Sequence, residues 1–204
     1  MSVQPSGAFD LLQRLRQPPA LPRPGERCDV CTGEVPDQHS HVVDLESRNL
    51  MCACRPCYLL FSAGGAGGKR FRAVPDRYVA LKGFALSPGQ WEELQIPVAM
   101  AFFFKNSVED RVVAFYPSPA GATESLLPLD AWDRLADANP ELADIETDTE
   151  ALLVRAPAEG YIVPIDACYE LVGQMRRLWQ GFDGGREARN ELDAFFTRVR
   201  AQAT

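Results

Sequence analysis

Five of the six cysteines and both histidines of this 204-residue chain lie within the thirty residues from Cys28 to Cys57. Four of these cysteines form two Cys-x-x-Cys pairs, Cys28 with Cys31 and Cys54 with Cys57, on either side of a 22-residue loop. Two such pairs joined by a loop of about twenty residues are typical of a tetrahedral site in which four thiolates hold one metal ion. No other pattern in the chain indicates chemistry so specifically.

The residues around the two pairs predict how each pair is presented. In 28–33, two thiolates can bind one ion while backbone N–H groups of a tight turn point at the sulfurs, and Gly33 supplies the positive φ that such a turn often needs. The second pair follows a predicted strand at 50–51 and precedes a predicted helical turn at 58–61. A treble-clef finger begins with a tight turn that carries one cysteine pair (a zinc knuckle), continues with a hairpin, and ends with a second pair at the start of a helix. A zinc ribbon would instead place the second pair on another knuckle. We therefore predict a closed structural Zn²⁺ site whose ligands are Cys28, Cys31, Cys54 and Cys57.

A further cysteine near the second pair, Cys52, is not needed by a four-thiolate site. Alternation along a strand places Cys52 and Cys54 on one face and Ala53 on the other. Cys52 therefore lies beside the metal as a spare thiol or replaces Cys54 as a ligand. The simpler interpretation is that Cys52 is a small buried hydrophobic residue.

The two histidines, His39 and His41, are two residues apart, so in an extended segment both side chains point the same way. If either one binds the metal, the site becomes Cys₃His, or a second site forms that is shared with Asp37 or Asp44. The simpler interpretation is that the histidines donate hydrogen bonds near the metal or lie on the surface. His39 and His41 are therefore possible ligands, as is Cys52.

Iron is the alternative to zinc at the four thiolates. A rubredoxin-like iron site uses the same ligand set, and the protein would then carry electrons. However, no Phe, Tyr or Trp lies between Cys31 and Cys54, where rubredoxins usually build an aromatic core. The second pair also lacks the following glycine of a second knuckle. The sequence therefore favours Zn²⁺.

The cluster is also similar to treble-clef endonucleases of the HNH type, in which a His precedes an Asn within a finger closed by Cys pairs. The match covers only about thirty residues, and the 22 residues between Cys31 and Cys54 are few for the usual catalytic insert. The last His of that family, on the helix after the second pair, is missing, since Tyr58 and Leu59 stand near its place. A nuclease is therefore the least favoured function.

The composition is that of a globular protein, with 46% hydrophobic and 24% charged residues. The longest apolar run, 96–104, has the length of one buried strand, and no run approaches the roughly 18 residues of a membrane span. No basic segment followed by an apolar one stands near the first residue, so we expect no signal peptide and predict a cytoplasmic protein. In that reducing compartment, clustered cysteines favour metal binding over disulfides.

Charge is unevenly distributed along the chain, whose net charge is −7. Residues 1–83 hold eleven Lys/Arg against eight Asp/Glu, and residues 84–204 hold ten against twenty. An acidic body disfavours binding to nucleic-acid phosphates, which needs clustered cations. The basic run within 69–77 could hold an anion or an acidic partner, and the acidic segment 146–150 could bind a hard cation. Solvated surface is the simpler interpretation of both segments.

Turn-forming segments divide the chain into three predicted parts. Residues 1–26 are predicted to form a short amphipathic helix at 9–16 followed by a proline-rich tether. Residues 27–62 are the cysteine-rich metal-binding module, and a glycine-rich stretch follows them. Residues 69–204 are predicted to form an acidic α+β domain.

Hydrophobic patterns predict the elements of this third part. The apolar segment 98–105 is predicted to be a central strand, with 111–116 as its hairpin partner and 151–156 as another strand. Two helices are predicted near the C-terminus, the first capped by Asp166 and the second at 186–201. Strands in the middle and helices at the end indicate an α+β fold with a central antiparallel sheet and two C-terminal helices.

Six stretches together resemble a family of uncharacterised actinobacterial proteins found in gene neighbourhoods of nickel–iron hydrogenases. They are 27–31 (RCDVC), 39–46 (HSHVVDLE), 50–61 (LMCACRPCYLLF), 73–77 (AVPDR), 168–172 (CYELV) and 179–185 (WQGFDGG). The resemblance covers nearly the whole chain. It implies an accessory or assembly role around a metalloenzyme, with hydrogenase components as protein partners.

The residues and this resemblance together predict a non-catalytic accessory or interaction protein that takes part in hydrogenase maturation or assembly. The metal is expected to staple the N-terminal third, which has few large apolar residues. The alternative function is a rubredoxin-like electron carrier or a metal-handling protein that uses the thiolates reactively.

Overall fold

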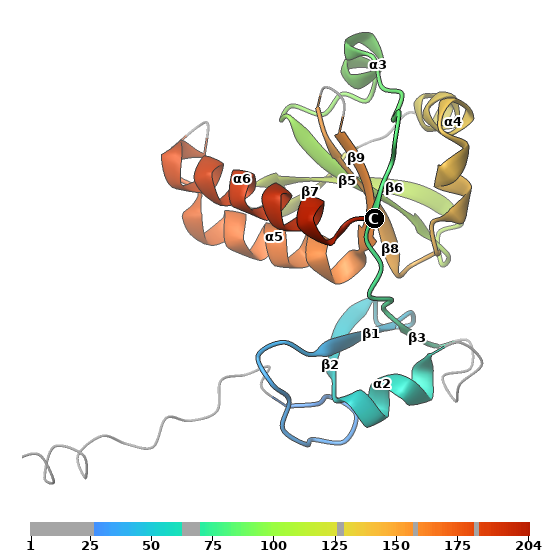
Figure 1. The fold of residues 1–204 in the computed structure, drawn as a ribbon, viewed down its shortest axis with the longest axis vertical. Coiled ribbons are helices and arrows are strands. Elements are labelled where there is room, and N and C mark those ends of the chain that lie inside the picture. Colours follow the sequence, from blue (N-terminus) through green and yellow to red (C-terminus); the bar gives the residue numbers. More distant parts are fainter. Residues whose placement is uncertain (1–26, 63–69, 126–128, 157–158, 182–183) are drawn as a thin grey trace, which may run out of the picture.

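The computed structural model describes residues 27–62, 70–125, 129–156, 159–181 and 184–204. Their strands form two antiparallel sheets, one of three strands and one of six, and helices pack on both (Figure 1). The α+β fold that the sequence predicts is therefore confirmed. The predicted helix at 9–16 and its tether lie outside the described residues.

The large sheet has the strand order β4-β9-β8-β5-β6-β7, and every neighbouring pair is antiparallel. Its strands are β4 (Val79–Ala80), β5 (Met100–Asn106), β6 (Arg111–Ser118), β7 (Gly121–Ser125), β8 (Glu150–Arg155) and β9 (Glu159–Pro164). The predicted strands at 98–105, 111–116 and 151–156 correspond to β5, β6 and β8. The central antiparallel sheet is thus confirmed.

Strand β5 lies in the interior of the sheet and is buried on both faces. Phe102 belongs to the core on one face and Phe103 to the core on the other, and both are fully buried. Because neighbouring side chains of a strand point to opposite faces, a strand covered on both sides must be apolar at every position. This is why residues 100–104 of β5 form an unbroken apolar run, and the polar Lys105 and Asn106 stand where the strand leaves the core.

Helices α5 (Ile165–Leu178) and α6 (Gly185–Gln202) cover the face of the sheet that carries Phe102 (Figure 1). The apolar positions of α5 recur at helical spacing and are buried: Cys168, Leu171, Val172 and Met175. The two predicted C-terminal helices are confirmed. Among the described residues, no helix is both long enough and apolar enough to cross a membrane.

Three shorter helices lie on the Phe103 side: α3 (Pro88–Glu93), α4 (Leu129–Ala138) and the 3₁₀-helix η1 (Pro140–Asp144). The buried Asn139 side chain lies between α4 and η1. Its amide donates to the carbonyls of Leu135 and Ala85, and its oxygen accepts from the Ala85 N–H. One buried side chain thereby fixes the end of α4 to a loop more than fifty residues away.

The small sheet carries the cysteine cluster and has the order β2-β1-β3. Its elements are β1 (Ser40–Asp44), β2 (Asn49–Ala53), helix α2 (Arg55–Phe61) and β3 (Phe71–Ala73). Strand β3 lies beyond the glycine-rich stretch, so the sheet takes strands from both sides of residues 63–69. The domain boundaries at 27–62 and 69–204 stay a prediction.

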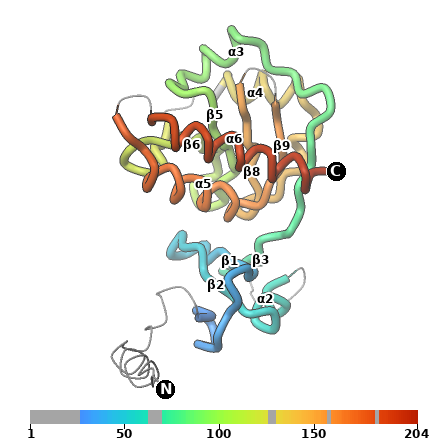
Figure 2. The backbone as a smooth tube through the Cα atoms, turned by 60° about the vertical axis from the view of Figure 1, so that its left-hand side comes forward, coloured from blue at the N-terminus to red at the C-terminus, as the bar shows by residue number. Residues whose placement is uncertain are grey.

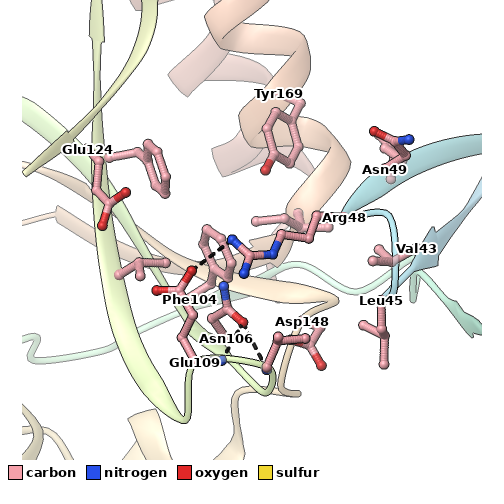
Figure 3. A pocket seen from close by; sticks show the side chains of 15 residues that line it. Val43, Leu45, Arg48, Asn49, Phe104, Asn106, Glu109, Glu124, Asp148 and Tyr169 are labelled. Carbon is pink, nitrogen blue, oxygen red and sulfur yellow. Dashed lines mark hydrogen bonds and ion pairs between the residues drawn. The ribbon is translucent and has the colours of Figure 1, made fainter. Parts of the chain in front are cut away.

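The small sheet and α2 gather at one end of the large sheet in both views (Figure 1, Figure 2). Val43 and Leu50 of the small sheet pack against the apolar core under α5 and α6. In the β1–β2 turn, Arg48 reaches across a cavity of about 150 Å³ to Glu109, and their charged atoms lie 2.8 Å apart (Figure 3). Apolar contact and ion pairing together hold the small sheet on the larger body.

Candidate metal centre

A tight turn presents the first cysteine pair. The Cys28 N–H donates to the Gly33 carbonyl at 2.7 Å, and the Thr32 N–H donates to the Cys28 carbonyl at 2.8 Å. The residue with positive φ in this turn is Thr32, at 62°, and the prediction that Gly33 would supply it is wrong. A Cβ at position 33 would lie 3.4 Å from the Cys31 sulfur, so Gly33 packs directly against the first cysteine pair.

The start of helix α2 presents the second pair. Cys54 is the N-cap residue, Cys57 lies in the first turn, and Pro56 occupies a position where a helix needs no N–H donor. The module therefore runs from knuckle to β1–β2 hairpin to helix, with the second pair opening the helix. This is the treble-clef order and not that of a ribbon.

The two pairs converge on one point. The four sulfurs of Cys28, Cys31, Cys54 and Cys57 all lie within 4.8 Å of one another, and those of Cys31 and Cys54 are 3.6 Å apart. Four sulfurs at 2.3 Å from a tetrahedral Zn²⁺ would be separated by about 3.8 Å. The cluster is thus already close to the geometry of a bound ion, and it could hold one.

The electrostatics of the four sulfurs also favour a cation. Burial acts to raise the pKa of the Cys28 thiol, but hydrogen bonds from the backbone of Cys54, Cys31 and Val30 outweigh burial and lower that pKa to about 6. The pKa of Cys57 is raised to about 12, first by its hydrogen bond with the Cys54 thiol and then by burial. Sulfurs this close repel one another as thiolates, whereas a divalent cation would attract all four.

The three remaining candidates, His39, His41 and Cys52, form a second group apart from the four thiolates. One ligand atom from each lies within 4.8 Å of the other two. His41 and Cys52 face each other in the β1–β2 register, and the rings of His39 and His41 have centroids 4.8 Å apart. Burial raises the pKa of the Cys52 thiol, and the charges of Asp29 and Cys28 add to this. Cys52 therefore accompanies the histidines and not Cys54.

Asp166 belongs to this second group, which the sequence did not indicate. Its Oδ2 accepts a hydrogen bond from His41 Nδ1 at 2.8 Å, across 125 residues of sequence. Asp166 is not the N-cap residue of α5, as the sequence predicted, because Pro164 holds that position. Asp166 lies in the first turn instead, where its Oδ1 accepts from the Ala167 N–H at 2.8 Å. Asp37 lines the same cavity as the two histidines, as the second-site alternative requires.

The other predicted partner of the histidines, Asp44, binds Arg70 instead. Its carboxylate accepts from Arg70 Nε at 3.0 Å and from another guanidinium nitrogen at 2.8 Å, and this pairing holds the pKa of Asp44 well below its usual range. Arg72 and Arg77 likewise bind Asp148 and Glu150. The described arginines of the basic run therefore bind the chain's own carboxylates, including those of the acidic segment 146–150.

A family model matches residues 27–203, from the knuckle to the end of α6. The chain belongs to the DUF5947 family. This is a family of unknown function, and no curated protein and no solved structure matches the chain. The DUF5947 match covers the cysteine cluster and the large sheet together.

Proposed function

We propose that this DUF5947 protein is a non-catalytic accessory protein whose N-terminal module is stapled by one Zn²⁺ bound to Cys28, Cys31, Cys54 and Cys57. The observation that carries the proposal is the convergence of four sulfurs from a turn and a helix start. Four protein ligands fill the coordination sphere of Zn²⁺, so such a site stabilises structure and offers no position for a substrate.

The small core of the module supports a structural role for the metal. Within 27–62 the buried hydrophobic residues are Cys28, Val42, Ala53 and Cys57. Two of these four are proposed ligands, and the other two are small or medium in size. Because so little apolar surface is buried, the module needs a metal to stabilise its fold.

Exposed apolar side chains on the module support a role in binding another protein. Among the described residues, Val30, Leu59 and Leu60 are exposed large hydrophobic residues of the module, and Leu60 is 52% exposed. Apolar side chains of this kind are common at protein interfaces. The family resemblance noted above points to components of a nickel–iron hydrogenase as the partner, during its maturation or assembly in the cytoplasm.

Co-purification from the source organism, grown so that it produces its hydrogenase, tests the partner. We expect tagged wild-type protein to enrich hydrogenase subunits and Leu60→Glu to lose them. Val108→Glu is the matched control, because Val108 is similarly exposed, at 57%, but lies on the body. Equal enrichment by both variants, or no enrichment of hydrogenase subunits by the wild type, would overturn this assignment.

An absorption spectrum with metal analysis tests the metal. Zn²⁺ has a filled d shell, so a zinc-loaded protein is colourless, whereas iron bound to four thiolates absorbs visible light. We expect protein purified under reducing conditions to contain zinc and to lack visible bands. Stoichiometric iron with such bands would favour the electron-carrier alternative.

A further inference from the structure

His39, His41 and Cys52 meet on one face of the β1–β2 hairpin. His41 and Cys52 are directly opposite in the antiparallel register, and His39 precedes His41 by two residues. The Cys52 backbone is fixed on both sides by Asp29, whose N–H donates to the Cys52 carbonyl at 2.8 Å and whose Oδ2 accepts from the Cys52 N–H at 2.6 Å. The position of the thiol is therefore set by the same turn that carries the first cysteine pair.

Both imidazoles are oriented by hydrogen bonds at Nδ1. His39 Nδ1 lies 2.8 Å from the Pro36 carbonyl oxygen, and His41 Nδ1 lies 2.8 Å from Asp166 Oδ2. Each of these oxygens can only accept, so in the neutral form of each ring the proton is on Nδ1 and Nε2 keeps its lone pair. This is the arrangement of metal-binding histidines, whose second nitrogen usually donates to a carbonyl or a carboxylate.

The other ring nitrogen of His39, Nε2, lacks a partner in the part of the chain that the structure describes. His39 Nε2 is buried and makes no hydrogen bond among the described residues. A buried imidazole nitrogen without a partner is costly, because it loses its hydrogen bond to water and gains nothing in exchange. A metal ion between His39, His41 and Cys52 would satisfy it.

We infer that His39 Nε2, His41 Nε2 and Cys52 Sγ form a second metal site, which takes a late first-row divalent ion such as Zn²⁺ or Co²⁺. Imidazole and thiolate donors suit these ions and not Mg²⁺ or Ca²⁺. This site goes beyond the proposed function, because three protein ligands leave one tetrahedral position for an exogenous ligand.

The open position has room for such a ligand. Both histidines line a cavity of about 700 Å³ where the small sheet meets the body. Its lining also includes four carboxylates and one guanidinium, those of Asp37, Asp76, Asp166, Glu170 and Arg55, so negative charge predominates. A small molecule carrying a donor atom for the metal and a positive charge for these carboxylates fits the chemistry of this cavity.

Cobalt binding to the full-length chain tests the site. We expect the metal-free, reduced wild type to bind two equivalents of Co²⁺, and His39→Ala, His41→Ala and Cys52→Ser to bind one. Each variant leaves the four thiolates intact, so circular dichroism of the zinc-loaded protein should stay unchanged. Cys168→Ala is the matched control, because Cys168 lies on the buried face of α5 and this variant should still bind two equivalents.

The outcomes distinguish this second site from the proposed four-thiolate site. A wild type that saturates at one equivalent, or a His41→Ala variant that still binds two, would overturn the second site. Loss of one equivalent in Cys52→Ser, with the remaining cobalt showing the spectrum of a four-thiolate site, would support it. If Cys31→Ser still binds two equivalents of Co²⁺ while His41→Ala binds one, the proposed four-thiolate site is contradicted and the second site is supported.

Asp166 acts in this site as a positioning residue. With the four thiolates already filled by Zn²⁺, Asp166→Asn should weaken Co²⁺ binding at the second site about 10–100-fold while the stoichiometry at saturation stays the same. Asp76→Asn is the control, because Asp76 lines the same cavity but makes no described contact with His41. An unchanged dissociation constant in Asp166→Asn would contradict the role of Asp166.

Discussion

The Arg77 guanidinium binds the fully buried carboxylate of Glu150, with Arg77 Nε donating to Glu150 Oε1 at 2.7 Å and a second nitrogen donating to Oε2. The same carboxylate accepts from the Glu146 N–H. Arg77 precedes β4 and Glu150 begins β8, so this pair joins the segment that leaves the small sheet to the interior of the large one.

Replacing Arg77 should therefore destabilise the whole chain. In Arg77→Met the buried Glu150 loses its charged partner, and we expect the free energy of unfolding to fall by about 1.5–3 kcal/mol. Urea denaturation followed by circular dichroism measures this change. Arg48→Met is the matched control, because the Arg48–Glu109 pair lies at the surface and should contribute less than about 1 kcal/mol. Equal losses in both variants would contradict this account.

Loss of one thiolate should unfold the metal module alone. In Cys31→Ser we expect the four-thiolate metal to be lost and amide hydrogens of 27–61 to exchange rapidly, because the few buried side chains of the module cannot hold it folded. The strands β5 and β8 should keep their protection. Hydrogen exchange with mass spectrometry and metal analysis test this, and Cys168→Ala should change neither. Retention of the metal in Cys31→Ser would refute the ligand set.

The Asp44–Arg70 pair predicts a specific dependence on pH. The pKa of Asp44 is lowered in the folded protein by the Arg70 guanidinium, so this ion pair stabilises the fold above the unfolded-state pKa of about 4 and is lost as the pH falls below it. We expect Asp44→Asn to be less stable than the wild type at pH 7. The difference should shrink at pH values below about 4, as measured by urea denaturation at each pH. A difference that stays constant down to pH 3 would contradict the pairing.

Replacing glycine by alanine should have opposite effects on stability at two positions, Gly160 and Gly173. A Cβ on Gly160 in β9 would lie only 2.6 Å from the Phe84 ring, so Gly160→Ala should overpack the core and cost about 1–3 kcal/mol of stability. Gly173 in α5 has no atom near the place of its missing Cβ, so Gly173→Ala should stabilise the helix by about 0.5–1 kcal/mol. Thermal unfolding of both variants checks the two signs. A stabilising Gly160→Ala would show that the Phe84 ring can move aside.

Local patterns predicted much of this fold. The Cys-x-x-Cys spacings, the apolar run of β5 and the helical spacing of Cys168, Leu171 and Met175 each depend on residues close in sequence. A few neighbouring residues are enough to predict a metal-binding thiolate pair or a buried strand. These elements were therefore found with nearly correct boundaries.

Contacts between distant segments were not predictable in the same way. Nothing near Asp166 indicates His41, and nothing near Cys52 indicates that it faces His41 and not the four thiolates. The sequence also suggested Asp166 as the N-cap residue of α5, but the helix begins at Ile165 and Asp166 lies in its first turn. The contact between His41 and Asp166 depends on how the small sheet docks on the body, and the contact between His41 and Cys52 depends on the register of the β1–β2 hairpin.

The pairing of β3 with β1 across residues 63–69 affects how the module can be produced in isolation. A fragment that ends at residue 62 keeps all four proposed thiolate ligands but leaves one side of β1 without a neighbour, and a bare strand edge invites chains to aggregate. A fragment that continues to residue 74 covers that edge with its own β3. The shortest well-behaved metal-binding fragment is therefore set by the covering of a strand edge, and not by the last cysteine.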